Sequence, residues 1–201
     1  VEAGFDAARI EAVSFGYNPD QFPAAAFEDR HGIVSVGADR GRDFSTLLQA
    51  VEGSDLQLHL YTDEGHLDGG ELPAEVVFHG RVPFGRYQEV LATASIVAIP
   101  THVMAYPSGQ TVALEAAGTG ACLVLTDTPA MREYFDDESA VFVSPGDTDG
   151  WRRALTELTS DAEKRRRLGR NAAALVGTHF TYTDMWSEVD EAIRRRGWAG
   201  Q

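Results

Sequence analysis

The sequence is poor in cysteine, in long apolar runs and in clustered metal ligands. Cys122 is the single cysteine, so no disulfide can form within the chain, and we expect a reduced, cytoplasmic setting. The longest apolar runs, around SIVAIP and ACLVLT, are far too short to span a bilayer. The six histidines never occur at the spacing of a zinc site, so we expect no bound metal.

Basic side chains are also scarce, and nearly all of them are arginines. The chain has 31 acidic and 17 basic residues, of which Lys164 is the one lysine, and its formal net charge is −14. Such a protein is a poor partner for a nucleic-acid backbone, which requires a basic face. A small phosphorylated ligand remains compatible, because it needs only local N–H donors and one or two arginines. We expect the KRRR and RRR runs to lie on exposed helix faces.

The length and composition describe one domain of ordinary size. The chain has 201 residues, 43% of them hydrophobic and 24% charged, which is typical of a globular protein with a full core. It begins at Val1 rather than at methionine. We therefore expect a piece of a longer protein, in which residues 1–201 form a single domain and a preceding part is missing.

Short apolar runs alternate with amphipathic segments over the first 145 residues. We expect strands at 10–15, 33–38, 56–62, 76–80, 95–101, 122–127 and 140–145. We expect helices at 43–53, 86–94, 109–118 and 129–135. The strands are rich in Val, Ile and Leu and nearly continuous in apolar character, which is typical of a parallel sheet covered on both faces. The alternation predicts a doubly wound α/β fold.

After Pro145 the pattern becomes helical and polar, and we expect a helical tail over about 147–201. Side chains that can cap helix N-termini precede two of its segments. The expected caps are Asp147 or Thr148 for the first helix and Ser160 or Asp161 for the second.

The stretch SIVAIPTHVMAYPSGQTVALEAAG predicts a strand, a long loop over 101–109 and a helix. In open α/β sheets, ligands bind off the carboxyl ends of the strands. Backbone N–H groups at the start of this helix would offer an anion site, and a glycine there lets a ligand approach closely. These positions are Ser108, Gly109, Gln110 and Thr111. Of the six histidines, His102 in this loop is the one we expect to contact a ligand.

Glu115 is the one carboxylate of this helix and shares a face with Thr111 and Gly118. At the edge of a cleft it could accept two hydrogen bonds from a vicinal diol such as a ribose. The alternative is an ordinary carboxylate that is partly exposed or paired with an arginine.

The segment IVSVGADRGRDFSTLLQA predicts a second strand, glycine-containing loop and helix. Its Gly37 and Gly41 form neither a dinucleotide fingerprint nor a P-loop. Arg40 and Arg42 at the end of a strand suit bidentate contacts to phosphate. The alternative is a helix start at Arg42, capped by Asp43.

With both loops in view, the chain resembles the carboxyl-terminal domain of retaining GT-B glycosyltransferases of family four, which use nucleotide-sugar donors. The resemblance runs from ARIEAVSFGYNPDQF to TDMWSEVDEAI, nearly the whole chain. It depends on VSFGYNPDQF, SVGADRGRDFSTLLQA, VVFHGRVPFGRYQEVLATASIVAIPT and SGQTVALEAAGTGACLVLTDTPAMREY, in the family's order. It implies a Rossmann-like parallel sheet that forms one half of a GT-B fold.

The resemblance implies roles for single residues. Glu115 falls on the second glutamate of a family pair and would hold the donor's ribose hydroxyls. Arg42 falls on the diphosphate-binding lysine. Ala38 stands where the family often has arginine, so Arg40 is expected to substitute. Arg42 and Arg40 would then be the catalytic cations that stabilise the leaving nucleotide diphosphate.

Further positions follow the same correspondence. The loop before Glu115 meets the donor's sugar and phosphates in the family, which would make His102 and 108–111 donor-binding. The remaining donor contacts would be Gly80, Arg81 and Val82 at the base and Gly16 near the diphosphate.

The chain departs from the family at Pro107, which stands in place of the first glutamate, the one that addresses the donor hexose. The loop ahead of it is also longer than usual. This departure leaves the donor sugar and catalytic competence open. One hypothesis is that Gln110 or Ser108 reads the sugar instead.

The resemblance therefore implies a domain that binds a UDP-, GDP- or ADP-sugar and needs no bound cofactor. It would transfer a hexosyl group to an unknown acceptor, and the isolated domain would be inactive without an amino-terminal, acceptor-binding GT-B domain. The full enzyme could dock at the inner membrane face. Two alternatives stay open: a nucleotide-sugar epimerase of GT-B shape, and a non-catalytic sugar-nucleotide binding module.

Overall fold

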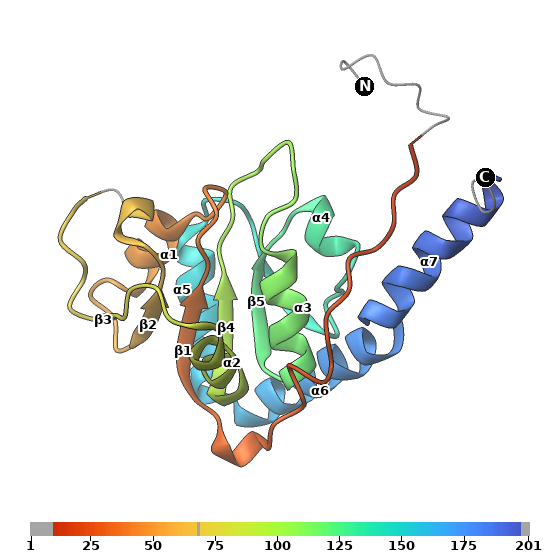
Figure 1. Ribbon diagram of the computed structural model, residues 1–201. Coiled ribbons are helices and arrows are strands. Elements are labelled where there is room, and N and C mark those ends of the chain that lie inside the picture. Colours follow the sequence, from red (N-terminus) through yellow and green to blue (C-terminus); the bar gives the residue numbers. More distant parts are fainter. Residues whose placement is uncertain (1–9, 68, 198–201) are drawn as a thin grey trace.

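Six parallel strands form one sheet in the order β3-β2-β1-β4-β5-β6 (Figure 1). The computed structural model describes residues 10–67 and 69–197. The strands are β1 (His31–Val36), β2 (Leu58–Tyr61), β3 (Val76–Phe78), β4 (Ala94–Ile99), β5 (Cys122–Thr126) and β6 (Ala140–Val143). Every neighbouring pair is parallel. The predicted doubly wound, Rossmann-like sheet is therefore confirmed.

Helices cover both faces of this sheet. They are α1 (Phe44–Val51), α2 (Phe84–Thr93), α3 (Gln110–Thr119), the short α4 (Pro129–Arg132), α5 (Thr148–Ser160), α6 (Ala162–His179) and α7 (Tyr182–Arg195), with 3-10 turns η2 (Phe27–Asp29) and η3 (Glu64–His66). One core cluster packs α2 and α3 on the sheet, a second packs α1 and α5 on the opposite face, and α6 contributes to both. The apolar strands are buried because both faces are covered.

The tail after β6 is helical, as predicted. Asp147 caps α5 by accepting a hydrogen bond from the backbone N–H of Gly150 at 2.8 Å, and Asp161 caps α6 by accepting one from Lys164 N–H, also at 2.8 Å. In α7, Thr181 and Asp184 form a capping box. Residues 198–201 of the predicted tail lie outside the described residues. No helix within 10–67 and 69–197 is long and apolar enough to cross a membrane.

The prediction of a strand at 10–15 is wrong. This segment is extended but has no strand partner, and side chains satisfy its backbone instead. Ser14 N–H donates to Glu188 Oε2 and Phe15 N–H donates to the Tyr134 hydroxyl, both at 2.8 Å. Apolar and β-branched residues gave the segment strand character, but both edges of the sheet lie elsewhere. It runs beside α7 instead (Figure 1).

Candidate functional site

The chain reverses its strand order between β1 and β4, which places the switch point of the sheet at their carboxyl ends. The two loops that leave these strands are joined to each other. Arg42 and Thr101 form an isolated antiparallel bridge. Asp43 N–H donates to the Pro100 carbonyl at 3.2 Å, and His102 N–H donates to the Gly41 carbonyl at 2.8 Å. The loops predicted to bind phosphate therefore form one structure.

The Arg42 guanidinium lies between two glycines of these loops. A Cβ atom built on Gly37 would come within 2.6–2.8 Å of the guanidinium, and one on Gly109 within 3.0 Å of Nη1. Arg42 is 7% exposed. Among the described residues, Nε and Nη1 have no hydrogen-bond partner. Burial lowers the pKa of Arg42 to about 10, although Tyr87 and Asp39 oppose that shift. Such a cation with unused donors is suited to binding an anion.

Of the two alternatives for the Arg42–Asp43 pair, the helix cap at Asp43 is confirmed, and phosphate binding by Arg42 stays a prediction. The Asp43 carboxylate caps α1, accepting from Thr46 N–H at 3.2 Å and from the Thr46 hydroxyl at 2.7 Å. The cap fixes where the chain turns into α1, and Arg42, one residue earlier, is thereby placed beneath the glycines. Asp43 also faces His102, whose Nδ1 lies 3.8 Å from Oδ2.

The start of α3 offers the second anion-binding feature. Gly109 precedes the helix with φ +87° and gives it no side-chain cap. The first hydrogen bond of the helix runs from the Ala113 N–H to the Gly109 carbonyl at 3.0 Å. The N–H groups of residues 110–112 therefore have no partner within the helix. They lie at the positive end of the helix dipole. The predicted donor loop therefore meets Arg42 at Gly109.

Asp39 joins the two loops, although no sequence motif marks it as a site residue. Its Oδ1 accepts from Gly41 N–H and from the Ser108 hydroxyl, each at 2.7 Å. The Ser108 hydrogen bond is the main reason that the pKa of Asp39 is lowered, and Gly41 and Arg42 add to it. Ser108 thus has a structural contact with Asp39, whereas Gln110 and Thr111 lie at the first two positions of the helix.

Glu115 follows on the buried side of α3 and is 9% exposed. Its carboxylate accepts a hydrogen bond from the hydroxyl of Tyr87 on α2. Burial raises the pKa of Glu115, and the Tyr87 hydrogen bond partly opposes the shift. Tyr87 in turn interacts electrostatically with Arg42. The alternative that Glu115 is an exposed or arginine-paired carboxylate does not hold. Glu115 is instead buried and paired with a phenol.

A cavity of about 270 Å³ opens beside Tyr87 at the ends of β1 and β2. Its walls bring together the β1 loop and the predicted base-contacting loop. They are Val36, Gly37, Ala38, Tyr61, Thr62, Arg81, Val82, Phe84 and Tyr87. Within the described residues the buried Thr62 hydroxyl has no hydrogen-bond partner. Gly80, next to Arg81, has φ +67°. Aromatic walls and an unused hydroxyl suit a planar polar ring.

A second cavity of about 300 Å³ lies on the other side of the Arg42 loop. Its walls are the whole of loop 101–108 together with Thr128, Pro129, Ala130 and Glu133. His102 lines it and is half exposed. Val103, Met104 and Tyr106 expose apolar surface here. Pro107 lies in this loop, so the departure from the family pattern falls at this second cavity.

Of the two remaining predicted residues, Gly16 lies apart from this group and Arg40 shares the β1 loop with Arg42. Arg40 is exposed on the β1 loop. Gly16 packs against α7: a Cβ atom there would come within 2.4 Å of the Thr181 carbonyl oxygen. A close backbone approach therefore accounts for glycine at position 16. The predicted ligand contacts of both residues stay predictions.

Gly109→Ala is expected to lower the free energy of unfolding by about 2–4 kcal/mol, because it adds strain at positive φ to overpacking. The new methyl group would meet Ile99 Cγ2 at 2.7 Å and Met131 Cε at 2.9 Å. Denaturant unfolding without ligand measures the change. Gly85→Ala is the control: nothing lies within 4 Å of its Cβ, in α2, and we expect a gain of about 0.5 kcal/mol. Equal stability of both variants would contradict the tight packing at Gly109.

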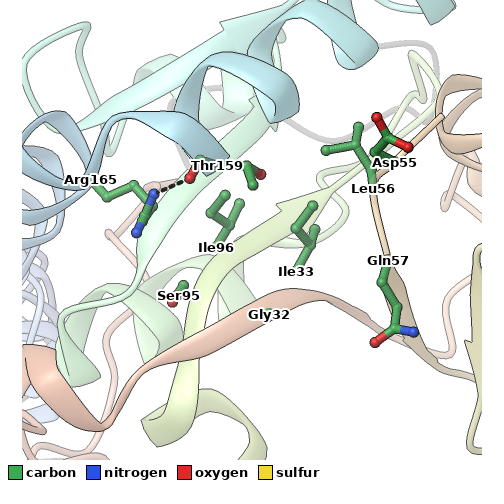
Figure 2. A pocket seen from close by; sticks show the side chains of 9 residues that line it. All are labelled: Gly32, Ile33, Asp55, Leu56, Gln57, Ser95, Ile96, Thr159 and Arg165. Atoms are coloured by element: carbon green, nitrogen blue, oxygen red, sulfur yellow. Dashed lines mark hydrogen bonds between the residues drawn. The ribbon is translucent and has the colours of Figure 1, made fainter.

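A third cavity, of about 220 Å³, lies near the amino ends of the strands (Figure 2). Ile33 and Ile96 form its floor at the amino ends of β1 and β4. At its side, Arg165 donates to the Thr159 carbonyl at 2.8 Å, at the end of α5 (Figure 2). Arg165 therefore binds a carbonyl at the carboxyl end of α5. The prediction that the KRRR run lies on an exposed helix face is wrong for this residue. The cavity lies away from the switch point.

The comparisons with known proteins agree with this geometry. A model of the family described as "Glycosyl transferase-like" matches residues 40–191. Sucrose-phosphate synthase from Thermosynechococcus elongatus is 18% identical with a TM-score of 0.79, over 94% of this chain and 53% of that one. Anabaena HepE, solved in complex with UDP-glucose, is 15% identical with a TM-score of 0.79, over 96% and 60%. No curated protein matches the chain.

A third structure bears on the extent of the fold. The C-terminal domain of a glycosyl transferase group 1 family protein, LpcC from Francisella tularensis, is 19% identical with a TM-score of 0.69. The alignment covers 83% of this chain and 100% of that domain. The chain thus has the fold of a GT-B carboxyl-terminal domain, and it spans between half and three fifths of the two longer structures.

Proposed function

The chain belongs to the glycosyl transferase-like family, and we propose that it is the donor-binding domain of a retaining GT-B glycosyltransferase of family four, with a nucleotide-diphosphate sugar as donor. The observation that carries the proposal is the buried Arg42 guanidinium, with unused donors, beside the uncapped start of α3 at the switch point of the sheet. A related structure solved with UDP-glucose supports this class of donor.

The diphosphate would lie between Arg42 and the N–H groups that open α3. As the bond from sugar to phosphate breaks, negative charge develops on the leaving diphosphate, and fixed cationic and N–H donors stabilise it without reorganising. Arg40, exposed on the same loop, could reach the outer oxygens. Thr111 and Gln110 follow at the helix start and face the same anion.

The nucleoside would extend from the diphosphate past Tyr87. Glu115 would accept hydrogen bonds from the ribose hydroxyls, and the base would enter the cavity that Arg81 and Val82 line, with Gly80 shaping their loop. The sugar would lie toward the second cavity, near His102 and Ser108. In this arrangement Gly16 supports the fold beside α7, and a contact with the diphosphate remains part of the proposal.

A further domain is proposed to supply the acceptor site. The chain spans 53% and 60% of the two longer structures that share its fold. We expect residues 1–201 to bind the donor and to catalyse no transfer alone. Retention is tested on the full-length enzyme, where the anomeric configuration of the product is read by NMR. An inverted product would contradict the retaining mechanism.

Donor binding is tested by titration calorimetry with UDP, GDP and ADP. We expect one of them to bind with a dissociation constant of about 10–100 μM, that is about −5.5 to −7 kcal/mol. The matching nucleoside monophosphate should bind at least tenfold more weakly, because it lacks one of the two phosphates that the Arg42 loop holds. A folded protein that binds none of the three diphosphates would refute the proposal.

A further inference from the structure

Tyr87 on α2 is marked by no sequence motif, yet its side chain meets two parts of the proposed nucleotide site. Its hydroxyl donates a hydrogen bond to Oε2 of Glu115 on α3. Its side chain lines the proposed base cavity together with Gly37 and Arg81. It also interacts electrostatically with Arg42. Tyr87 thus contacts the Glu115 carboxylate and lines the proposed base cavity with the same side chain.

The position of the Tyr87 hydroxyl is fixed by its surroundings. Tyr87 lies in the first turn of α2, where its N–H donates to the Pro83 carbonyl at 3.0 Å. Its ring meets the edge of the Phe22 ring at a centroid distance of 5.9 Å and an interplanar angle of 81°. Phe22 is 2% exposed and belongs to the core. The phenol therefore reaches Glu115 from a rigid support.

The electrostatic surroundings of Glu115 are simple. Burial is the main influence on its pKa and raises it, while the Tyr87 hydrogen bond lowers it. Its neighbours in α3, Leu114 and Ala116, are apolar. From the β1 loop, Arg42 acts on Tyr87 and holds down the pKa of its hydroxyl, which burial and Glu115 raise. Tyr87 is thus the charged or titratable group that faces Glu115 from a packed neighbouring element.

We propose that Tyr87 is a positioning residue for nucleotide recognition: it holds the Glu115 carboxylate in the orientation that accepts the ribose hydroxyls at the edge of the proposed base cavity. This inference rests on the proposed function. With Oε2 engaged by the phenol, Oε1 faces an incoming hydroxyl in a single orientation. Without the phenol, the carboxylate can rotate and has lost its neutral donor.

The test compares Tyr87→Phe with Tyr182→Phe, a matched loss of one phenol at the exposed start of α7, outside the proposed site. Titration calorimetry measures UDP affinity from pH 5 to pH 8. We expect Tyr87→Phe to lose about tenfold in affinity at pH 7. We also expect its affinity to rise with pH at a higher midpoint than in the wild type, because burial then acts on Glu115 unopposed. Tyr182→Phe should retain the wild-type affinity and midpoint.

Unchanged affinity and midpoint in Tyr87→Phe, with binding lost in Glu115→Ala, would overturn this inference and leave the proposed function intact. A wild-type protein that binds no nucleotide diphosphate would overturn both. Carboxyl NMR of the unliganded protein gives an independent readout: Tyr87→Phe should raise the pKa of Glu115, and an unchanged value counts against the role. Matching thermal transitions of the variants show that each is folded.

Discussion

Replacing Arg42 by methionine is expected to weaken UDP binding about 100-fold and, in the same variant, to raise the free energy of unfolding by about 1–2 kcal/mol. The two effects have one cause. The guanidinium is buried without hydrogen-bond partners for Nε and Nη1 among the described residues. Burial of this cation therefore opposes folding. The buried position becomes favourable only when an anion binds to the guanidinium.

The opposite signs of these effects make the experiment informative. A purely structural arginine would, on removal, lower the stability of the protein and leave its UDP affinity unchanged. Calorimetry measures the affinity, and denaturant unfolding without ligand measures the stability. Arg170→Met is the control, because Arg170 is exposed on α6 and carries the same charge. We expect it to change neither quantity beyond twofold in affinity or about 0.5 kcal/mol in stability. Loss of stability in Arg42→Met with UDP affinity retained would assign Arg42 to the fold alone.

Glu115→Gln is expected to weaken UDP binding about 10- to 100-fold at pH 7, while pyrophosphate binding stays within a factor of two. The amide keeps the size of the carboxyl group but has one acceptor oxygen and no charge, so it holds ribose hydroxyls less well. Pyrophosphate lacks a ribose and serves as the internal control for the Arg42 loop. Equal losses for both ligands would mean that Glu115 acts on the diphosphate site instead.

The same substitution has a pH signature in the unliganded protein. Burial holds the pKa of Glu115 above 4.5, its ordinary value. The native state therefore binds more protons than the unfolded state in this range, and its stability falls as the pH rises through 4.5 toward the raised pKa. Glutamine removes this dependence. We expect Glu115→Gln to be more stable than the wild type at pH 7, by a margin that shrinks as the pH falls. A margin independent of pH would contradict the burial of a charged carboxylate.

The sequence predicted the sheet well because its signal is local. Runs such as CLVLT are apolar, β-branched and bounded by turns, and a strand buried on both faces needs little else. Residues 10–15 have the same character, but whether they pair depends on a free sheet edge. The hydroxyl of Tyr134 and the carboxylate of Glu188, far along the chain, satisfy their N–H groups instead. No pattern within the segment carries that information.

The candidate site divides in the same way. Arg42 and Gly109 follow two strands whose carboxyl ends must meet at one edge, so topology alone brings them together. The sequence could not predict that Arg42 is buried between two glycines, because this burial depends on the close approach of two loops. The contacts of Asp39 and Tyr87 could not be predicted because their partners, Ser108 and Glu115, come from other elements. Long-range contacts of this kind produce no residue pattern in the local sequence.

The most direct measurement is the structure of this domain with UDP bound at saturating concentration. The account predicts diphosphate oxygens within hydrogen-bond distance of the Arg42 guanidinium and of the N–H groups that open α3, with the ribose hydroxyls at the Glu115 carboxylate. A diphosphate bound elsewhere, with Arg42 still enclosed by Gly37 and Gly109 and making no contact to it, would contradict the account.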